Sequence, residues 1–256
     1  MITFSEAQIM AWLSPFLWPF LRVLAVFTSA PIFSTRAFPV RARIGLALLV
    51  TVACQATLPP MPVIDLNSPV AFGVVVQQVG IGLAIGFVVR LVFAAFELAG
   101  EVVGFQMGLN FAAFFDPALN TQASAVARFF GYMASLLFVV LNGHLMVLMA
   151  VTRSFEVFPV TQNFLEALRL MQLYTLGGEL FANALWIALP MLALLLFTNL
   201  ALGIISRVAP QMNIYAVGFP ITLSVGLVGM AATLPMLDRP FQSLLERAIE
   251  IFTTGR

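Results

Sequence analysis

The chain has 256 residues, of which 61% are hydrophobic and only 9% are charged. A soluble domain averages about 25% charged residues, so this composition excludes a soluble globular protein and predicts an integral membrane protein. The formal net charge of +1 argues against the strongly basic surface that binds nucleic acid.

Six apolar segments follow one another along the chain. A helix needs about 20 residues to cross a hydrocarbon core of about 30 Å. Backbone groups in lipid must be hydrogen-bonded within their own segment, so apolar runs of this length predict helices. We expect an all-α membrane protein with about six long, partly kinked helices. The segments cover residues 7–33, 44–58, 69–96, 123–151, 180–205 and 214–236.

Several of these segments contain polar groups that are costly in lipid. The first contains Arg22, and the third contains Gln77 and Gln78. A charge at the centre of a bilayer costs a few kcal/mol, so such groups should face protein or water. A single chain of this size has little interior in which to bury them. The sequence therefore predicts a subunit of a larger helical assembly.

Four charges in the third segment, just after it and in the fourth segment are candidates for a buried polar or charged network: Arg90, Glu97, Glu101 and Arg128. Glu97 and Glu101 are four residues apart and share one helix face. The four could line a polar path, or they could be paired across a helix interface, as buried charges usually are. Both interpretations stay open.

Three glycines mark a predicted helix contact. Gly100, Gly104 and Gly108 recur at four-residue intervals and lie on one helix face. Small residues at this spacing allow two helix backbones to approach closely. They are expected to be helix-contact glycines.

An aromatic stretch, "GFQMGLNFAAFFDPALNTQ", covers residues 104–122. Its Asp-Pro step and its asparagines favour a turn over a helix. Irregular backbone at membrane depth is tolerated inside protein or beside an aqueous cavity. Apolar rings in such a cavity can constrict a pore by excluding water. The stretch is either a movable stopper or a loop whose rings pack into the subunit's own core.

Enzyme chemistry has little support in the residue inventory. His144 is the single histidine, and all twelve basic residues are arginine. A helical zinc site of the metalloprotease type needs two histidines, and a P-loop needs lysine. No catalytic residue, metal or cofactor is expected.

The last segment, "FQSLLERAIEIF" at residues 241–252, is amphipathic. Its apolar side chains recur at helical spacing, and its charged ones fall on the opposite side. It predicts an interfacial or docking helix.

Four motifs together resemble the FliR family, the R subunit of the flagellar type III protein export gate, which has relatives among injectisome export-gate subunits. They are "FLRVLAVFTSAPIFSTRAFPVRARIGLAL" (residues 20–48), "GFQMGLNFAAFFDP" (104–117), "FVVLNGHL" (138–145) and "ISRVAPQMNIYAVGFPITL" (205–223). Each is moderately specific, and their order and spacing extend the resemblance over nearly the whole chain.

The resemblance implies a non-enzymatic, pore-forming subunit that passes unfolded flagellar proteins across the bacterial inner membrane, within the basal body. Its expected partners are the P and Q subunits FliP and FliQ, the switch subunit FlhB, FlhA and the basal-body ring. It also implies a plug loop at residues 105–122, with Phe111 and Phe114 as plugging rings. Met107, Asn110, Phe115 and Asp116 would shape that loop.

The resemblance further implies a division within one helical subunit. Residues 1–176 would be P-subunit-like, residues 177–236 would form a Q-subunit-like helical hairpin, and residues 237–256 would be the amphipathic C-terminal helix. The hairpin would turn near the cytoplasmic entrance, at Arg207, Pro210, Gln211 and Asn213.

One alternative is a stand-alone small-solute permease. It would bind its solute through Gln77, Gln78, Arg90 and Glu97. No inverted repeat is evident, which weakens this alternative.

Overall fold

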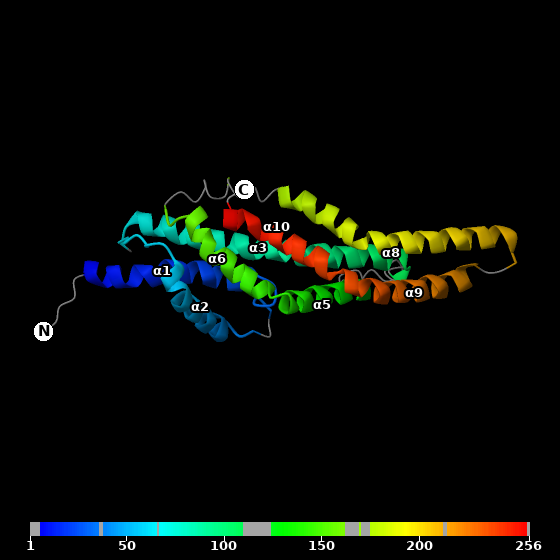
Figure 1. The fold of residues 1–256 in the computed structure, drawn as a ribbon, viewed down its shortest axis with the longest axis horizontal. Helices are drawn as coiled ribbons and strands as arrows, with labels where there is room; N and C mark the ends of the chain where they lie inside the picture. Colours follow the sequence, from blue (N-terminus) through cyan, green and yellow to red (C-terminus); the bar gives the residue numbers. More distant parts are fainter. Residues whose placement is uncertain are drawn as a thin grey trace. The chain divides into compact units, whose positions relative to one another are not determined.

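The computed structural model describes residues 6–35, 38–65, 67–109, 124–161, 169, 175–211 and 214–254. Within these residues the regular secondary structure is helical, which confirms the predicted all-α class. The α-helices are α1 Glu6–Ser29, α2 Val40–Cys54, α3 Pro69–Gln106, α5 Ala125–Val140, α6 Gly143–Val157, α8 Thr175–Val208, α9 Ile214–Thr233 and α10 Asp238–Thr254 (Figure 1). Two short 3-10 helices, Gln55–Thr57 and Leu234–Met236, follow α2 and α9.

Among the described residues, five helices are long and apolar enough to cross a membrane, or six if α5 and α6 count as one bent span. This confirms the prediction of a helical membrane protein with about six spans. The five are Met10–Ser29, Val40–Thr57, Pro69–Gln106, Thr175–Val208 and Val217–Met236.

The fourth predicted segment is two helices rather than one. Helix α5 ends at Val140 and α6 begins at Gly143. Between them Asn142 adopts the left-handed conformation, with φ 55°. Asparagine tolerates this conformation better than most residues. The kink expected in this long segment is therefore a complete break.

The chain divides into two compact units. The first contains Met1–Leu91, Asn142–Gly177 and Leu245–Arg256, and the second contains Val92–Leu141 and Gly178–Leu244. Each unit is described separately below.

In the first unit, α1 packs closely on a glycine face of α3. A Cβ atom at Gly82 would lie 2.6 Å from Cβ of Ala25, and one at Gly86 would lie 2.7 Å from the backbone N of Ala30 and against the Ser29 side chain. Real Cβ atoms do not approach other atoms this closely. The two glycines therefore set the distance between these helices, as small residues do in membrane proteins.

We expect Gly86→Ala to destabilise the protein by about 1–3 kcal/mol, since the added methyl overpacks the contact with α1. Gly73→Ala is the matched control on the same helix, because a Cβ there meets nothing within 4 Å. In an open helix position alanine is more favourable than glycine, by up to about 1 kcal/mol. The thermal midpoint of the purified protein should therefore fall for Gly86→Ala and stay level or rise for Gly73→Ala. Equal midpoints would contradict the close contact.

In the second unit, aromatic rings from three helices form a buried cluster. Ring centroids of Phe93 lie 5.6 Å from Phe138 and 6.0 Å from Phe241, and those of Phe96 and Phe241 are 5.4 Å apart. Edge-to-face pairs at these distances add to the stabilisation that burial gives. Phe241 is the first apolar residue of the amphipathic stretch in α10.

The apolar face of α10 is buried in protein. Its buried residues recur at helical spacing, while Gln242, Glu246 and Glu250 on the other side are exposed. In the first unit, Phe252 packs against Phe158 at 6.2 Å. Of the two predictions for this segment, a docking helix is the one that these contacts support. The buried residues are Phe241, Leu245, Ile249 and Phe252.

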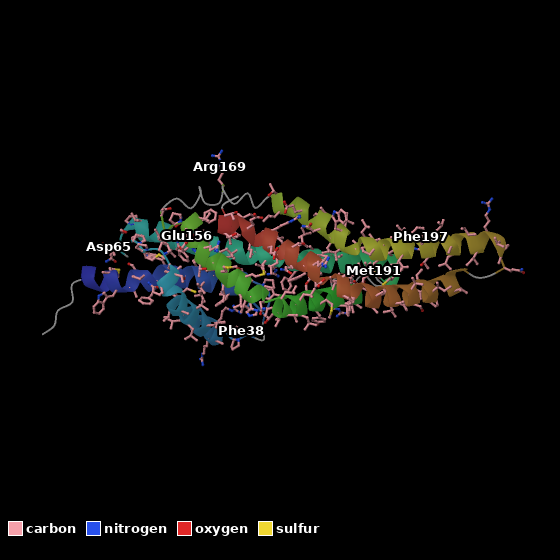
Figure 2. The ribbon with its side chains drawn as sticks, in the orientation of Figure 1. Phe38, Asp65, Glu156, Arg169, Met191 and Phe197 are labelled. Carbon is pink, nitrogen blue, oxygen red and sulfur yellow. The ribbon has the colours of Figure 1, made fainter. Side chains whose placement is uncertain are left out.

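Helices α8 and α9 of the second unit lie side by side and run in opposite directions (Figure 1). A Cβ atom at Gly229 would lie 2.6 Å from Leu194 and 2.9 Å from Met191, whereas one at Gly218 would lie 3.8 Å from Leu202. The contacted residue of α8 has a higher sequence number where the α9 residue has a lower one, which is the pattern that two antiparallel helices give. The outer face is apolar and open: Phe197, labelled in Figure 2, is 71% exposed.

Candidate functional site

The candidate site is the base of the aromatic stretch, within the second unit. Five of its predicted plug residues lie outside the described residues: Asn110, Phe111, Phe114, Phe115 and Asp116. The structure does describe the chain on either side, at residues 107–109 and from residue 124 onwards. These flanking residues show how the stretch is attached.

The first attachment is the end of α3. The Met107 N–H donates to Val103 O at 2.9 Å, and the Gly108 N–H donates to Phe105 O at 3.0 Å. Gly108 has φ 80°, a left-handed conformation that glycine adopts without strain. Such a glycine ends a helix. The third of the predicted contact glycines therefore terminates α3.

Met107 is fully buried against α9. Its side chain lies across Gly226, where a Cβ atom would be 2.5 Å from Met107 Cε and 2.7 Å from Cγ and Sδ. The Thr222 hydroxyl donates to the Met107 carbonyl at 3.3 Å. A side chain and a backbone group of the same residue are thus held by one face of α9.

The second attachment is the start of α5. The Ser124 N–H donates to Glu101 Oε1 at 2.8 Å, and Ser124 Oγ caps α5 by accepting from the Ala127 N–H at 3.1 Å. A Cβ atom at Gly100 would lie 2.7 Å from Ala127 Cα, and one at Gly104 would lie 3.2 Å from Ser124 Oγ. Gly100 and Gly104 thus face α5 of the same chain.

The four charges of the predicted network are not buried within this chain. Arg90, Glu97 and Arg128 are exposed, and Glu101 is half-buried. Glu97 lies against Gly131, and Glu101 holds Ser124.

A buried polar centre instead surrounds Arg22 in the first unit. Arg22 is 0% exposed. Its Nε donates to Gln78 Oε1, its Nη1 to Ser154 Oγ and its Nη2 to Phe158 O, each at 2.9 Å. Its guanidinium carbon lies 3.7 Å from the centroid of the Phe155 ring. These partners fix α1 to α3 and α6.

Gln77 extends the Arg22 centre to the chain after α6. Its Nε2 donates to Pro159 O at 3.2 Å and to Thr161 Oγ1 at 3.1 Å, and its Oε1 accepts from the Thr161 N–H at 3.0 Å. Gln78 Nε2 donates to the same Oε1 at 3.0 Å. Both amides are occupied by the protein itself, and Arg90 is exposed elsewhere. The binding site required by a permease is therefore not assembled.

The predicted cytoplasmic turn begins with Arg207 in the last turn of α8 and continues beyond the helix at Pro210. Arg207, Pro210 and Gln211 are exposed, and Asn213 lies outside the described residues.

Comparisons with known proteins identify relatives over nearly the whole length. Residues 13–248 match the family described as bacterial export proteins, family 1. This chain belongs to that family. It is 42% identical over 241 residues to the flagellar biosynthetic protein FliR of Pectobacterium carotovorum, covering 94% of this chain and 92% of the relative. It is 41% identical to the protein of the same name from Escherichia coli, covering 93% and 90%. The Bacillus subtilis protein of that name is 28% identical.

The predicted resemblance to the FliR family is thereby confirmed. The family is described as bacterial export proteins and its relatives are named flagellar biosynthetic proteins, so the prediction of a non-enzymatic export component is also confirmed.

Proposed function

We propose that this chain is a pore-forming subunit of the flagellar type III export gate, in the inner membrane within the flagellar basal body. It passes unfolded flagellar proteins through a pore that it builds with other subunits. The observation that carries the proposal is the family match over residues 13–248, together with relatives named flagellar biosynthetic proteins that cover most of the chain.

Within that function, residues 105–122 form the plug of the closed pore. Phe111 and Phe114 fill its centre, and Met107, Asn110, Phe115 and Asp116 shape the loop. The two attachments support this role, because hydrogen bonds and tight packing hold both ends of the stretch. Rings on fixed ends can close a narrow path by excluding water.

The partners are the P and Q subunits FliP and FliQ. Residues 1–176 form a P-like part and residues 177–236 a Q-like hairpin, followed by the C-terminal helix within 237–256. The antiparallel pair of α8 and α9 supports the hairpin, and its exposed apolar side chains suit packing against other membrane helices. Arg90, Glu97 and Arg128 become buried in such contacts.

The turn of the hairpin, with Arg207, Pro210, Gln211 and Asn213, faces the cytoplasmic entrance. There it lies near the switch subunit FlhB, with FlhA and the basal-body ring as further neighbours. Exposure of the three described residues of this turn supports a contact surface.

Purification from a host that produces the whole gate tests the proposal. A gate subunit should be recovered together with other membrane chains, in a complex whose mass is not a multiple of 27.8 kDa. Expressed alone, it should aggregate or degrade, since its exposed apolar helix faces lack their partners. If the chain is instead recovered as a stable monomer or homo-oligomer, both from the host that produces the whole gate and when it is expressed alone, the result would favour a permease.

A further inference from the structure

One face of α9 contacts the start of the aromatic stretch at three places. Phe219, Thr222 and Gly226 recur at intervals of three and four residues and therefore share that face. The Phe219 ring would lie 3.4 Å from a Cβ atom at Gly108. Thr222 binds the Met107 carbonyl, and Gly226 accommodates the Met107 side chain. We call these three residues the α9 seat.

The Thr222 hydroxyl offers the Met107 carbonyl, just past the end of α3, a donor on α9. The last carbonyls of a helix have no donor one turn further on. Met107 is buried, so its carbonyl has little access to water. An unsatisfied backbone carbonyl is costly in an apolar environment. The single hydroxyl proton of Thr222 is shared between Met107 O and two nearer acceptors on its own helix, Gly218 O and Phe219 O, both at 3.1 Å.

The glycine at position 226 is needed for the same contact. A methyl group there would overlap three atoms of the Met107 side chain. Met107 would have to leave the face of α9, and its carbonyl would move with it. The seat therefore depends jointly on a small residue and a hydroxyl.

We propose that Thr222 and Gly226 are positioning residues that act through Met107. They fix the place and the direction in which the aromatic stretch leaves α3. This role rests on the proposed plug function, and it makes the Q-like hairpin the element that aims the plug.

The test is ion leak through the assembled, idle complex in lipid vesicles. Thr222→Val keeps the shape and removes the hydrogen bond, and Gly226→Ala displaces Met107. A typical hydrogen bond corresponds to about a fivefold shift between the held and released positions, so we expect Thr222→Val to raise the leak up to about fivefold. Gly226→Ala should raise it at least as much, because the added methyl overlaps the Met107 side chain. Gly218→Ala and Ser224→Ala are matched controls on α9, because a Cβ at Gly218 has ordinary contacts and the Ser224 hydroxyl donates to Pro220 O of its own helix. Controls that leak as much as the seat variants would overturn the proposal.

A disulfide tests the contact within one protein preparation. Met107 Cγ lies 2.7 Å from the Cβ position at Gly226. The two Cβ atoms are thus about 4 Å apart or less, within reach of a disulfide. Met107→Cys with Gly226→Cys, in a Cys54→Ala background, should leak when reduced and reseal when oxidised. The reduced and oxidised forms come from the same assembled preparation. An equal leak in the two forms would overturn the proposal.

Deleting residues 110–120 separates failure of the seat from failure of the plug. If the complex with the deletion leaks and the complexes with seat variants do not, the plug role is supported and the positioning role is refuted. If the complex with the deletion does not leak, the plug role and the positioning role are both refuted.

Discussion

Deletion of residues 110–120 is expected to make the assembled export gate conduct ions freely while no substrate is present. The deleted stretch contains Phe111, Phe114 and Phe115. Apolar rings close a pore by making the constriction unfavourable for water, and ions do not pass without water. Removing the stretch that carries the rings should leave the constriction open. Ion flux into vesicles that contain the purified complex measures the effect.

Replacing the two proposed plugging rings alone should give a smaller leak. Phe111→Ala with Phe114→Ala retains the loop, and truncating a buried ring costs about 3–5 kcal/mol at most. All variants must co-purify with the same partner chains as the intact protein. The plug role would be refuted by a deletion complex that assembles fully and stays as tight as the intact one.

The helices could be predicted from the sequence because lipid leaves the backbone few alternatives. An apolar run long enough to span must form a helix, so five of the six predicted segments each correspond to a single helix of the structure. The break at Asn142 could not be predicted by the same argument. Asn142 and Gly143 are two residues inside a long apolar run, and hydropathy averages over them. The left-handed conformation depends on local backbone geometry rather than on hydropathy.

The charged residues show a second limit. Arg90, Glu97 and Arg128 were predicted to be buried because a charge in a membrane segment is costly, yet they are exposed on this chain. The free-energy cost of a charge in a membrane segment indicates that the charge needs a polar or charged partner. It does not indicate whether that partner belongs to the same chain. Arg22, by contrast, is fully buried, and its partners are 56 and 132 residues away for Gln78 and Ser154. Neutral acceptors so distant in sequence give no charge pattern by which to recognise them.

Replacing Arg22 is expected to be the most destabilising single substitution in the first unit. Arg22→Met keeps much of the apolar volume but leaves Gln78 Oε1 and Phe158 O without their donor. Each buried acceptor left unsatisfied costs about 1–3 kcal/mol. For the two acceptors, at roughly 2–4 °C per kcal/mol for a chain of this size, the thermal midpoint should fall by about 4–24 °C. Differential scanning of the purified complex measures it.

Two comparisons separate the network from the charge itself. Arg22→Lys keeps the charge but presents one ammonium in place of the planar fork that reaches three acceptors, so it should recover only part of the loss. Arg153→Met removes an exposed arginine beside Ser154 on α6 and should leave the midpoint unchanged. If the Arg22 centre acts as one network, Gln78→Leu must lower the thermal midpoint less in the Arg22→Met protein than in the intact protein. In the Arg22→Met protein the substitution removes an oxygen that has already lost its donor. Strict additivity of the two substitutions would show that Arg22 stabilises the unit by packing over Phe155 rather than through its hydrogen bonds.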